Sequence, residues 1–470
     1  MFWSILVMLL WGGPLGCIDP KSTEDIGKLL GEIPHGSVRQ VILWKTAVIG
    51  DQMRALQENT SEPFQILSPP RAKSLVTIVE WPSLNAAEKA REKLKERNDI
   101  ESVTDDFKLP FEIRGSSIRE PLQEPYLSRA WHLEKMEVAA AWNQSMGDPS
   151  ILVAVVDLGF EQNHPEFIAA PRSGEEEPDA WFVNSAEIPG NNQDDDGNGL
   201  IDDVSGWNFA TNSANLIYGA APTHGTAVAS IIGGRINGRG SLGVCPRCAL
   251  LPVVIDDKIS SIVLAYQYIS QFPVAVVNNS WGFRLVLPEM ESLIQVLKEV
   301  YHNGRAGLGT GIVFAMSNNH RNDCLGSTPD ISSLPFVIAV SGMNRNERKI
   351  YKSGFGDCTD LVAPTSENTR EAIVAADRVG SKGTNQGSGD DLDDWDYTQK
   401  FYGTSAAAPQ VAAALALVIG QRSQETIQTA QDILFRQAKK VDPDTGSYDP
   451  ETGRSVHYGY GMVSLQALGI

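Results

Sequence analysis

Long apolar runs without polar alternation mark the chain from residue 151 onward. They lie at 151–156, 250–255, 274–277, 312–316 and 336–340. Strands that are covered on both faces show such runs, and they belong to parallel sheets. Stretches with helical spacing separate the runs, near 225–233, 260–272, 288–303, 406–420 and 424–440. The pattern predicts a doubly wound α/β fold, in which active sites gather at the carboxyl ends of the strands.

The part of the chain before residue 124 follows a different pattern. Residues 37–46 alternate apolar and polar side chains like a strand, and 75–80 and 100–108 look like further strands. Residues 84–98 are strongly helical. We therefore predict a small α+β domain over 37–112 and a linker over 113–123, where Gly, Ser and Pro gather. The main α/β domain then covers 124–470.

Charge is spread unevenly over these two parts. The chain carries 39 Lys and Arg against 58 Asp and Glu, a formal net charge of -19, and 42% of its residues are hydrophobic. Residues 18–123 hold 17 acidic and 15 basic residues, which leaves 41 acidic and 24 basic residues for 124–470. The apolar content suffices for a sizeable core. The acidic balance argues against a nucleic-acid partner, which would require a basic surface.

The first residues have the pattern expected of an export signal. Phe2 to Trp11 form an apolar run that is too short to span a bilayer but suits the core of a signal peptide. We predict a signal peptide over 1–17, a linker over 18–36, and a protein that is secreted or held at the cell envelope. Leu15-Gly16-Cys17 resembles a lipoprotein site, so a lipid anchor at Cys17 is a second hypothesis. The alternative is a buried N-terminal strand.

Cysteine usage agrees with an oxidising compartment. The chain has five Cys, and four remain after Cys17. We predict two disulfides, Cys324–Cys358 and Cys245–Cys248. The alternative for the second pair is a redox or metal-binding CxxC, although a zinc site needs four ligands and no second pair stands nearby.

Four polar residues stand where the predicted fold would bring them together. Asp157 directly follows the run 151–156, and Asn318 follows the run 312–316. His224 precedes a stretch of small residues at the start of one helix. Ser405 lies at the N-terminal edge of another, because Pro409 is best tolerated in a first turn. Ser, His and Asp are the groups of acyl transfer, and a side-chain amide donates to the oxyanion that forms.

The motifs around these residues resemble one known family. DLGF, HPEF, THGTAVAS, NNSWG, SNN and GTSAAAP, in that order, resemble the subtilisin-like serine peptidases over roughly 124–470. The resemblance implies a subtilisin-like fold, with Asp157, His224 and Ser405 as the catalytic triad and Asn318 as an oxyanion donor. It also implies that Ser280-Trp281-Gly282 pairs with the extended backbone of a polypeptide substrate.

The resemblance further implies how the chain is organised. The domain over 37–112 would be a ferredoxin-like propeptide that inhibits its own peptidase domain until cleavage within 112–124. The protein would then be a secreted zymogen of a serine endopeptidase, acting as a monomer.

Several positions depart from the family pattern, and they motivate alternatives. Leu158 replaces a small hydroxyl residue, Ser317 replaces Gly, Ala406 replaces Met and Gln410 replaces His. Residues 253–269 also lack the usual Gly-rich loop. One alternative is therefore a catalytically impaired protein-binding module on the same fold. A second is a sedolisin-type peptidase, but that family uses Glu as base and Asp at the oxyanion position, unlike His224 and Asn318.

An acidic segment at 191–203 predicts a calcium site. Its carboxylate and amide oxygens recur at short spacing, and its glycines permit sharp turns. The candidate ligands are Asp194, Asp196, Asn198, Asp202 and Asp203. The alternative is a solvated acidic turn.

Overall fold

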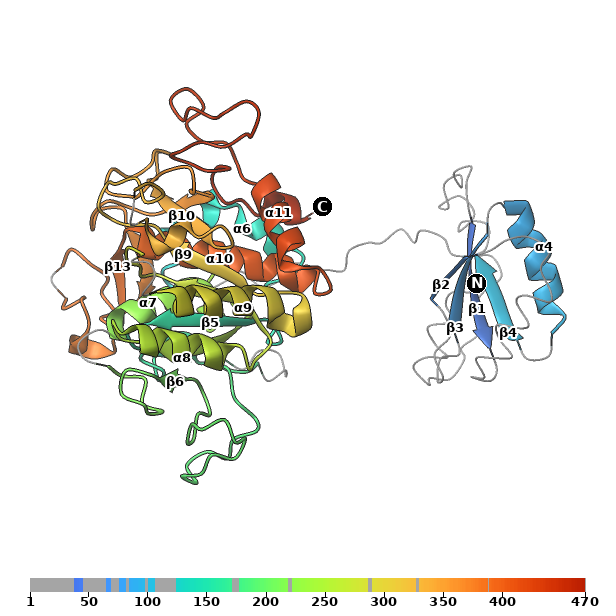
Figure 1. Ribbon diagram of the computed structural model, residues 1–470, viewed down its shortest axis with the longest axis horizontal. Helices are drawn as coiled ribbons and strands as arrows, with labels where there is room; N and C mark the ends of the chain where they lie inside the picture. Colours follow the sequence, from blue (N-terminus) through green and yellow to red (C-terminus); the bar gives the residue numbers. More distant parts are fainter. Residues whose placement is uncertain are drawn as a thin grey trace. The chain divides into compact units, whose positions relative to one another are not determined.

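The computed structural model describes two groups of residues. One is 124–470 without 171–176, 219–221, 286–289, 327–328, 388 and 470; the other is 38–44, 65–68, 76–81, 84–97 and 100–105. The chain divides into two compact units, Met1–Arg114 and Gly115–Ile470 (Figure 1). The predicted signal peptide and the linkers at 18–36 and 113–123 lie outside the described residues, so the predicted domain boundaries stay predictions.

The first unit is a small antiparallel sheet with one described helix. Its elements are β1 (Val38–Trp44), β2 (Gln65–Ser68), β3 (Val76–Trp81), α4 (Leu84–Lys95) and β4 (Ile100–Asp105). The strands pair in the order β2-β3-β1-β4. Helix α4 buries Ala86, Ala87, Ala90 and Leu94, whose spacing places them on one face. Strand β2 was not predicted, because a segment of four residues carries too little pattern.

The second unit contains the parallel sheet that the apolar runs predict. Its seven strands pair in the order β11-β10-β9-β8-β5-β7-β6, all in parallel. They are β5 (Leu152–Asp157), β6 (Trp207–Asn208), β7 (Ala249–Val254), β8 (Val274–Asn279), β9 (Gly311–Ala315), β10 (Ile338–Met343) and β11 (Leu361–Pro364). The short strands β6 and β11 were not predicted. The α/β fold class is confirmed.

Helices cover both faces of this sheet. They are α7 (Pro222–Gly233), α8 (Ile259–Ile269), α9 (Glu291–Gly307), α10 (Thr404–Gln421) and α11 (Ile427–Arg436), with the short α5 (Trp131–Lys135) and α6 (Val138–Trp142) before the first strand. Helix α8 packs against α9, and α10 packs against both α7 and α11. In Figure 1, α8 and α9 lie in front of the sheet and α10 lies behind it.

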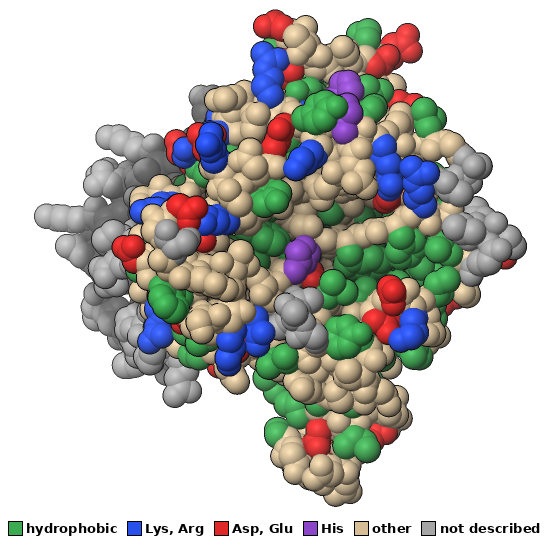
Figure 2. Space-filling model, turned by 90° about the vertical axis from the view of Figure 1, so that its left-hand side faces the viewer, with side chains coloured by type: hydrophobic (Ala, Val, Ile, Leu, Met, Phe, Trp, Pro, Cys, Tyr) green, Lys and Arg blue, Asp and Glu red, His purple; other side chains and the backbone are tan. Residues whose placement is uncertain are grey.

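An antiparallel hairpin that was not predicted accompanies the sheet. It consists of β12 (Ile373–Ala376) and β13 (Tyr397–Phe401). The loop between its strands contains a run of acidic residues at 390–396. On the face drawn in Figure 2, acidic and basic side chains are intermingled, and a histidine side chain lies near the centre next to a band of hydrophobic side chains.

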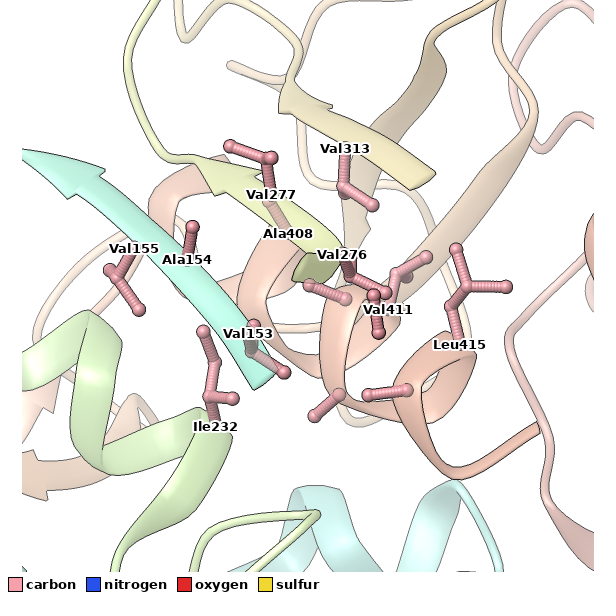
Figure 3. Close-up of a cluster of buried hydrophobic side chains, with 14 of the residues drawn as sticks. Val153, Ala154, Val155, Ile232, Val276, Val277, Val313, Ala408, Val411 and Leu415 are labelled. Atoms are coloured by element: carbon pink, nitrogen blue, oxygen red, sulfur yellow. The ribbon is translucent and has the colours of Figure 1, made fainter. Parts of the chain in front are cut away.

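Helix α10 fills the centre of the core. All of its residues from Ala406 to Ile419 are buried, and most of them are small. By length and composition it could cross a membrane, but 83% of it is buried inside the protein, as in a core helix. Figure 3 shows Ala408, Val411 and Leu415 of α10 close to the valines of β8 and β9. Alanine side chains allow this close approach to the sheet.

Leu415 has the largest side chain of these three α10 residues, so its truncation tests the packing of the core. Leu415→Ala should lower the free energy of unfolding by about 2–5 kcal/mol, because it leaves a cavity between α10 and the sheet. Leu264→Ala is the matched control, since Leu264 is 49% exposed on α8, and it should change stability by less than about 0.5 kcal/mol. Urea unfolding in a Ser405→Ala background measures both. Equal losses would contradict this account of the core.

Candidate active site

The fold brings Asp157, His224 and Ser405 to one edge of the sheet. Asp157 is the last residue of β5, His224 lies in the first turn of α7, and Ser405 is the second residue of α10. Strand β5 sits between β8 and β7, where the chain changes direction across the sheet. Such a switch point leaves an open crevice at the carboxyl ends of parallel strands.

Close packing at Gly225 sets the distance between α7 and the end of β5. A Cβ atom at Gly225 would lie 2.3 Å from the carbonyl oxygen of Gly159 and 3.0 Å from Asp157 Cβ. Any side chain there would push α7 away from the strand. Glycine therefore allows His224, the neighbouring residue, to reach Asp157.

The carboxylate of Asp157 holds the imidazole of His224. Nδ1 of His224 lies 2.9 Å from Oδ1 and 3.0 Å from Oδ2 of Asp157. Asp157 is 1% exposed, whereas the His224 side chain is 35% exposed. Burial by itself lowers the pKa of His224, but the charge of Asp157 and the hydrogen bond to it outweigh that effect, so the pKa is raised. Nδ1 is thereby fixed as the donor, and Nε2 is left to act as a base.

The departure at Leu158 does not leave Asp157 without support. The backbone N–H of Leu158 donates to Oδ1 of Asp157 over 2.8 Å. The Leu158 side chain itself is 38% exposed. A backbone donor thus supplies a hydrogen bond that a side-chain hydroxyl at this position would otherwise offer.

Ser405 and Ser280 form a reciprocal pair of hydrogen bonds. The Ser405 hydroxyl donates to the carbonyl oxygen of Ser280, and the Ser280 hydroxyl donates to the carbonyl oxygen of Ser405, both over 3.0 Å. Between the described residues Ser405 and His224 there is no hydrogen bond in this state. Rotation of the Ser405 side chain would redirect its hydroxyl from Ser280, as hydroxyl rotors allow.

Asn318 follows β9 and has a fixed orientation. Its Oδ1 accepts a hydrogen bond from the backbone N–H of Thr404 over 3.1 Å. A Cβ atom at Gly403, whose φ is 81°, would lie only 3.0 Å from that oxygen. Because Oδ1 is held by the start of α10, Nδ2 remains as a donor beside Ser405. This is the arrangement that an oxyanion donor requires.

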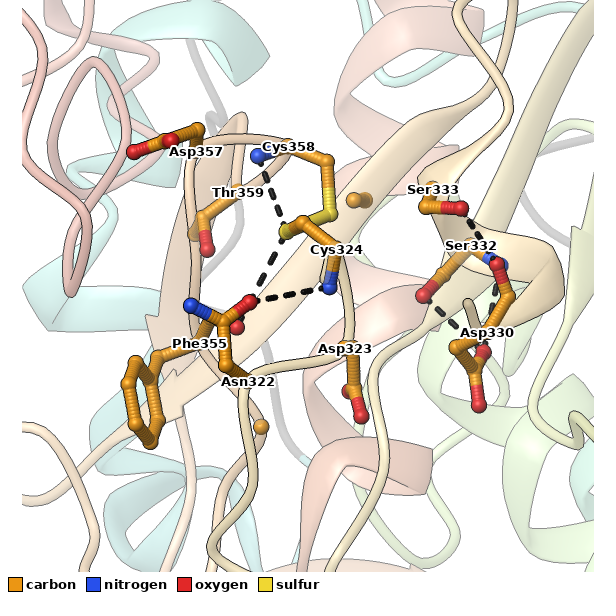
Figure 4. The surroundings of a disulfide bond; sticks show 12 residues. Asn322, Asp323, Cys324, Asp330, Ser332, Ser333, Phe355, Asp357, Cys358 and Thr359 are labelled. Atoms are coloured by element: carbon orange, nitrogen blue, oxygen red, sulfur yellow. Dashed lines mark hydrogen bonds between the residues drawn. A yellow bond between two sulfur atoms is a disulfide. The ribbon is translucent and has the colours of Figure 1, made fainter. Parts of the chain in front are cut away.

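Ser317, the second departure from the family pattern, is also hydrogen-bonded. The buried carboxylate of Asp323 accepts from the backbone N–H and from the hydroxyl of Ser317, both over 2.8 Å. Asp323 directly precedes the Cys324–Cys358 disulfide, as Figure 4 shows. The hydroxyl of Ser317 therefore helps to fix the segment that carries Asn318.

Both predicted cysteine pairs are bonded. The structure contains the disulfides Cys245–Cys248 and Cys324–Cys358. Because the sulfurs of Cys245 and Cys248 are bonded to each other in this structure, neither is present as a thiolate that could bind a metal. The second pair joins the segment after Asn318 to the segment before β11.

The departures on α10 serve packing. Gln410 is fully buried, and its Nε2 donates to the carbonyl oxygens of Pro364 and Ala406, both over 2.7 Å. Ala406 is also fully buried. Neither residue lines the pocket beside Ser405.

A pocket of about 310 Å³ lies beside Ser405. Ser405, Asn318 and the predicted substrate segment Ser280-Trp281-Gly282 all line it, so the fold brings these predicted site residues together. The Trp281 indole N–H donates to the carbonyl oxygen of Val156 in β5 over 2.9 Å, which ties the segment to the sheet. The remaining lining residues are Phe283, Arg284, Ala315, Met316, Ser317, Asn319, Arg321, Asp330 and Thr404.

The predicted calcium ligands are only partly brought together. Carboxylate oxygens of Asp194 and Asp196 lie with one of Glu187 within 4.8 Å of one another. Glu187 was not predicted, because it precedes the acidic segment and joins it only through a turn. It is 5% exposed, and among the described residues its Oε2 has no hydrogen-bond partner.

The other predicted ligands have local hydrogen bonds. Asp202 accepts from the backbone N–H groups of Gly190 and Asn192. Asn198 donates from Nδ2 to Asp196 and Asp203. A buried, unpaired carboxylate oxygen next to two further carboxylates fits a divalent cation that prefers oxygen ligands.

Comparison with known sequences agrees with the motifs. The profile of the Subtilase family, peptidase S8, matches residues 148–461. The chain belongs to the subtilase family. This subtilase is 27% identical over 384 residues to a protein of Nostoc sp. named calcium-dependent protease, covering 74% of this chain and 52% of that protein. It is 23% identical over 343 residues to subtilisin E of Bacillus subtilis, covering 71% and 70%. The chain thus spans about half the length of its Nostoc relative.

Solved structures show the same fold for this subtilase. A lanthipeptide protease superposes with a TM-score of 0.55 at 20% identity, covering 73% of this chain and 95% of that one. Fervidolysin of Fervidobacterium pennivorans gives a TM-score of 0.54 at 19% identity, covering 93% and 61%.

The contact between Asp157 and His224 predicts how His224 titrates. The pKa of His224 should lie above the ordinary value of about 6.5, and Asp157→Asn should lower it, because the carboxylate that raises it is removed while burial remains. NMR titration of the imidazole in a Ser405→Ala background measures this. The control Asp432→Asn removes an equal charge from α11 and should leave His224 unchanged. A pKa that is the same in the Asp157→Asn variant would contradict the assignment.

Proposed function

We propose that this subtilase is a serine endopeptidase that hydrolyses peptide bonds through an acyl-enzyme on Ser405. The observation that carries the proposal is the fixed imidazole of His224. Its Nδ1 is held by Asp157, while Ser405 and the oriented amide of Asn318 line one pocket. These groups supply a nucleophile, a base and an oxyanion donor.

Each group has one role in the proposed reaction. The Ser405 oxygen attacks the scissile carbonyl carbon and its proton moves to Nε2 of His224, while Asp157 stabilises the imidazolium. The oxyanion accepts from Nδ2 of Asn318 and from the backbone N–H of Ser405 at the start of α10. When the C–N bond breaks, the amine leaves with the proton from His224. Water, deprotonated by His224, then releases the acid product and restores Ser405.

The substrate would be an extended polypeptide. Its backbone would pair with Ser280-Trp281-Gly282, where hydrogen bonds to main-chain groups give affinity without depending on side chains. Gly282 is exposed, which leaves its backbone accessible. We favour polypeptide hydrolysis over the alternative of a binding module. That alternative was motivated by Leu158 and Ser317, and both residues make hydrogen bonds that support the site.

Export and self-inhibition are parts of the same proposal. The first unit would be the inhibitory propeptide, removed by cleavage within 112–124, and the signal over 1–17 would direct secretion. The two disulfides suit an oxidising compartment. Retention at the cell envelope through Cys17 and a monomeric mature enzyme complete the proposal.

Replacement of the nucleophile tests the proposed activity. Ser405→Ala should abolish labelling by a fluorophosphonate probe and lower peptide hydrolysis by about 10⁶-fold, because the hydroxyl that would form the acyl-enzyme is removed. Ser447→Ala, at an exposed position, is the matched control and should keep both. N-terminal sequencing of the same secreted proteins reports on maturation: wild type should begin within 112–124 and Ser405→Ala should keep its first unit. Labelling that persists in Ser405→Ala would refute the assignment.

We also propose that Glu187, Asp194 and Asp196 hold a calcium ion that stabilises the fold. The main support for this proposal is the Oε2 atom of Glu187, which is buried and has no hydrogen-bond partner among the described residues. The Nostoc relative is named a calcium-dependent protease, which is consistent with the proposal. When bound, the ion would neutralise the clustered carboxylates and join the turn at 187 to the segment 194–196. It has no role in the proposed acyl transfer.

Metal removal tests the calcium site. In the Ser405→Ala protein, calcium at about 100 times its dissociation constant should add about 2.7 kcal/mol to the free energy of unfolding, and a chelator should reverse this. Glu187→Gln should lose the gain, whereas the exposed control Glu451→Gln should keep it. Thermal melting with and without calcium measures the effect. An equal gain in Glu187→Gln would exclude the assigned ligands.

A further inference from the structure

The pocket beside Ser405 carries charged side chains of both signs. Arg284, Arg321 and Asp330 line it, and Asp323 lies buried behind Arg321. A residue whose carbonyl group lies between Ser405 and Asn318 has this pocket next to its side chain. The charged groups therefore face the side chain that precedes the scissile bond, and their hydrogen bonds decide which charge the pocket accepts.

Two carboxylates hold the guanidinium of Arg321 in one orientation. Its Nε donates to Asp323 Oδ1 over 2.6 Å, and its Nη2 donates to Asp330 Oδ2 over 2.5 Å. The side chain remains 25% exposed. Among the described residues, its third nitrogen, Nη1, has no hydrogen-bond partner. A planar guanidinium that is fixed at two nitrogens presents the third as an oriented donor.

The carboxylates themselves have little left to offer a substrate. Asp323 is 1% exposed and accepts from Ser317 as well as from Arg321. Asp330 is 3% exposed, and its Oδ1 accepts from the backbone N–H and the hydroxyl of Ser332. Both acids are thus occupied by partners within the protein. The pocket presents donors, with the exposed Arg284 as a second positive charge.

We propose that Arg321 makes this subtilase select an acidic side chain, Glu or Asp, immediately before the scissile bond. The inference rests on the proposed peptidase function and names its substrate class. The methylene groups of the substrate side chain would lie against the rings of Trp281 and Phe283, which line the same pocket. The carboxylate would accept from Nη1 of Arg321 in a charge-assisted hydrogen bond.

Other side chains fit these groups less well. A basic side chain would have to displace Arg321 from the buried carboxylate of Asp330, which would break an ion pair and leave one charge without its partner. A large apolar side chain would cover Nη1 without offering an acceptor, and an unsatisfied buried donor is costly. A neutral acceptor satisfies Nη1, whereas a negatively charged one also makes a charge-assisted hydrogen bond and complements Arg284.

Peptides that differ at one position test the proposal on the full chain after maturation. The residue before the scissile bond is set to Glu, Asp, Gln, Leu, Phe or Arg in one otherwise constant sequence. kcat/KM should be at least about tenfold higher for Glu than for its neutral isostere Gln, because the site discriminates by a charge-assisted hydrogen bond. The ratio should fall as ionic strength rises. A preference for Arg, Phe or Leu over Glu in the wild type would overturn the proposal.

Arg321→Gln tests the residue itself. It should reduce the Glu-to-Gln ratio to near one, whereas Arg321→Lys, which keeps the charge, should retain part of it. Arg345→Gln is the charge-matched control, because Arg345 lies outside the pocket over the ring of Trp131, and it should keep the full ratio. Fluorophosphonate labelling of Ser405 counts active sites in every variant. Wild type that labels but shows no acidic preference refutes only this inference, whereas absent labelling refutes the proposed function.

Discussion

The close packing of α10 against the sheet is the contact on which the rest of this structure depends. The helix is buried from Ala406 to Ile419, and its small side chains allow it to lie directly on β8 and β9. Its first residues are tied to the carboxyl ends of those strands. Thr404 donates from its hydroxyl to the carbonyl oxygen of Met316 over 2.6 Å and from its backbone N–H to Asn318. A shift of α10 would therefore move Ser405 and the amide of Asn318 together.

Asp323 connects the two halves of the pocket in a similar way. One buried carboxylate accepts hydrogen bonds both from Ser317, next to Asn318, and from Arg321, and all three of these residues line the pocket. The neighbouring disulfide Cys324–Cys358 restrains the same segment, and Figure 4 shows the two together with Asp330. Asn318, which would stabilise the oxyanion, and Arg321, which would bind the substrate side chain, are thus both held in place through Asp323. Ser317, which departs from the family pattern, contributes to this arrangement through its hydrogen bonds to Asp323.

Much of the fold followed from local pattern, whereas much of the site's detail did not. The long apolar runs predicted β5, β7, β8, β9 and β10, because burial on both faces removes polar residues from a strand. The strands β6 and β11 and the hairpin of β12 and β13 are short or half polar, so their sequences carry no comparable pattern. Asp157, Asn318 and Ser405 could be placed because each stands at the end of a predictable element.

The partners of these residues could not be read from the sequence, because they come from distant segments. Glu187 reaches Asp194 and Asp196 only through a turn, and Gln410 meets Pro364 only after α10 has docked. The same reasoning applies to Asp323, whose side chain looks like an ordinary surface acid in the sequence. Hydrogen bonds between segments that are distant in the sequence determine which polar side chains are buried and which residues they bind. The type of residue alone does not show this.

The position of α10 after every strand of the parallel sheet has a consequence for biosynthesis. Strands β5, β8 and β9 leave the ribosome well before the helix that covers them, and contacts between such distant segments form slowly. Until Gln421 has emerged, the part of the sheet that α10 covers stays exposed, which makes an incomplete chain prone to aggregation. A chain that ends before α10 lacks both this part of the core and Ser405. The core is therefore completed by the same helix that brings Ser405 to the ends of the strands.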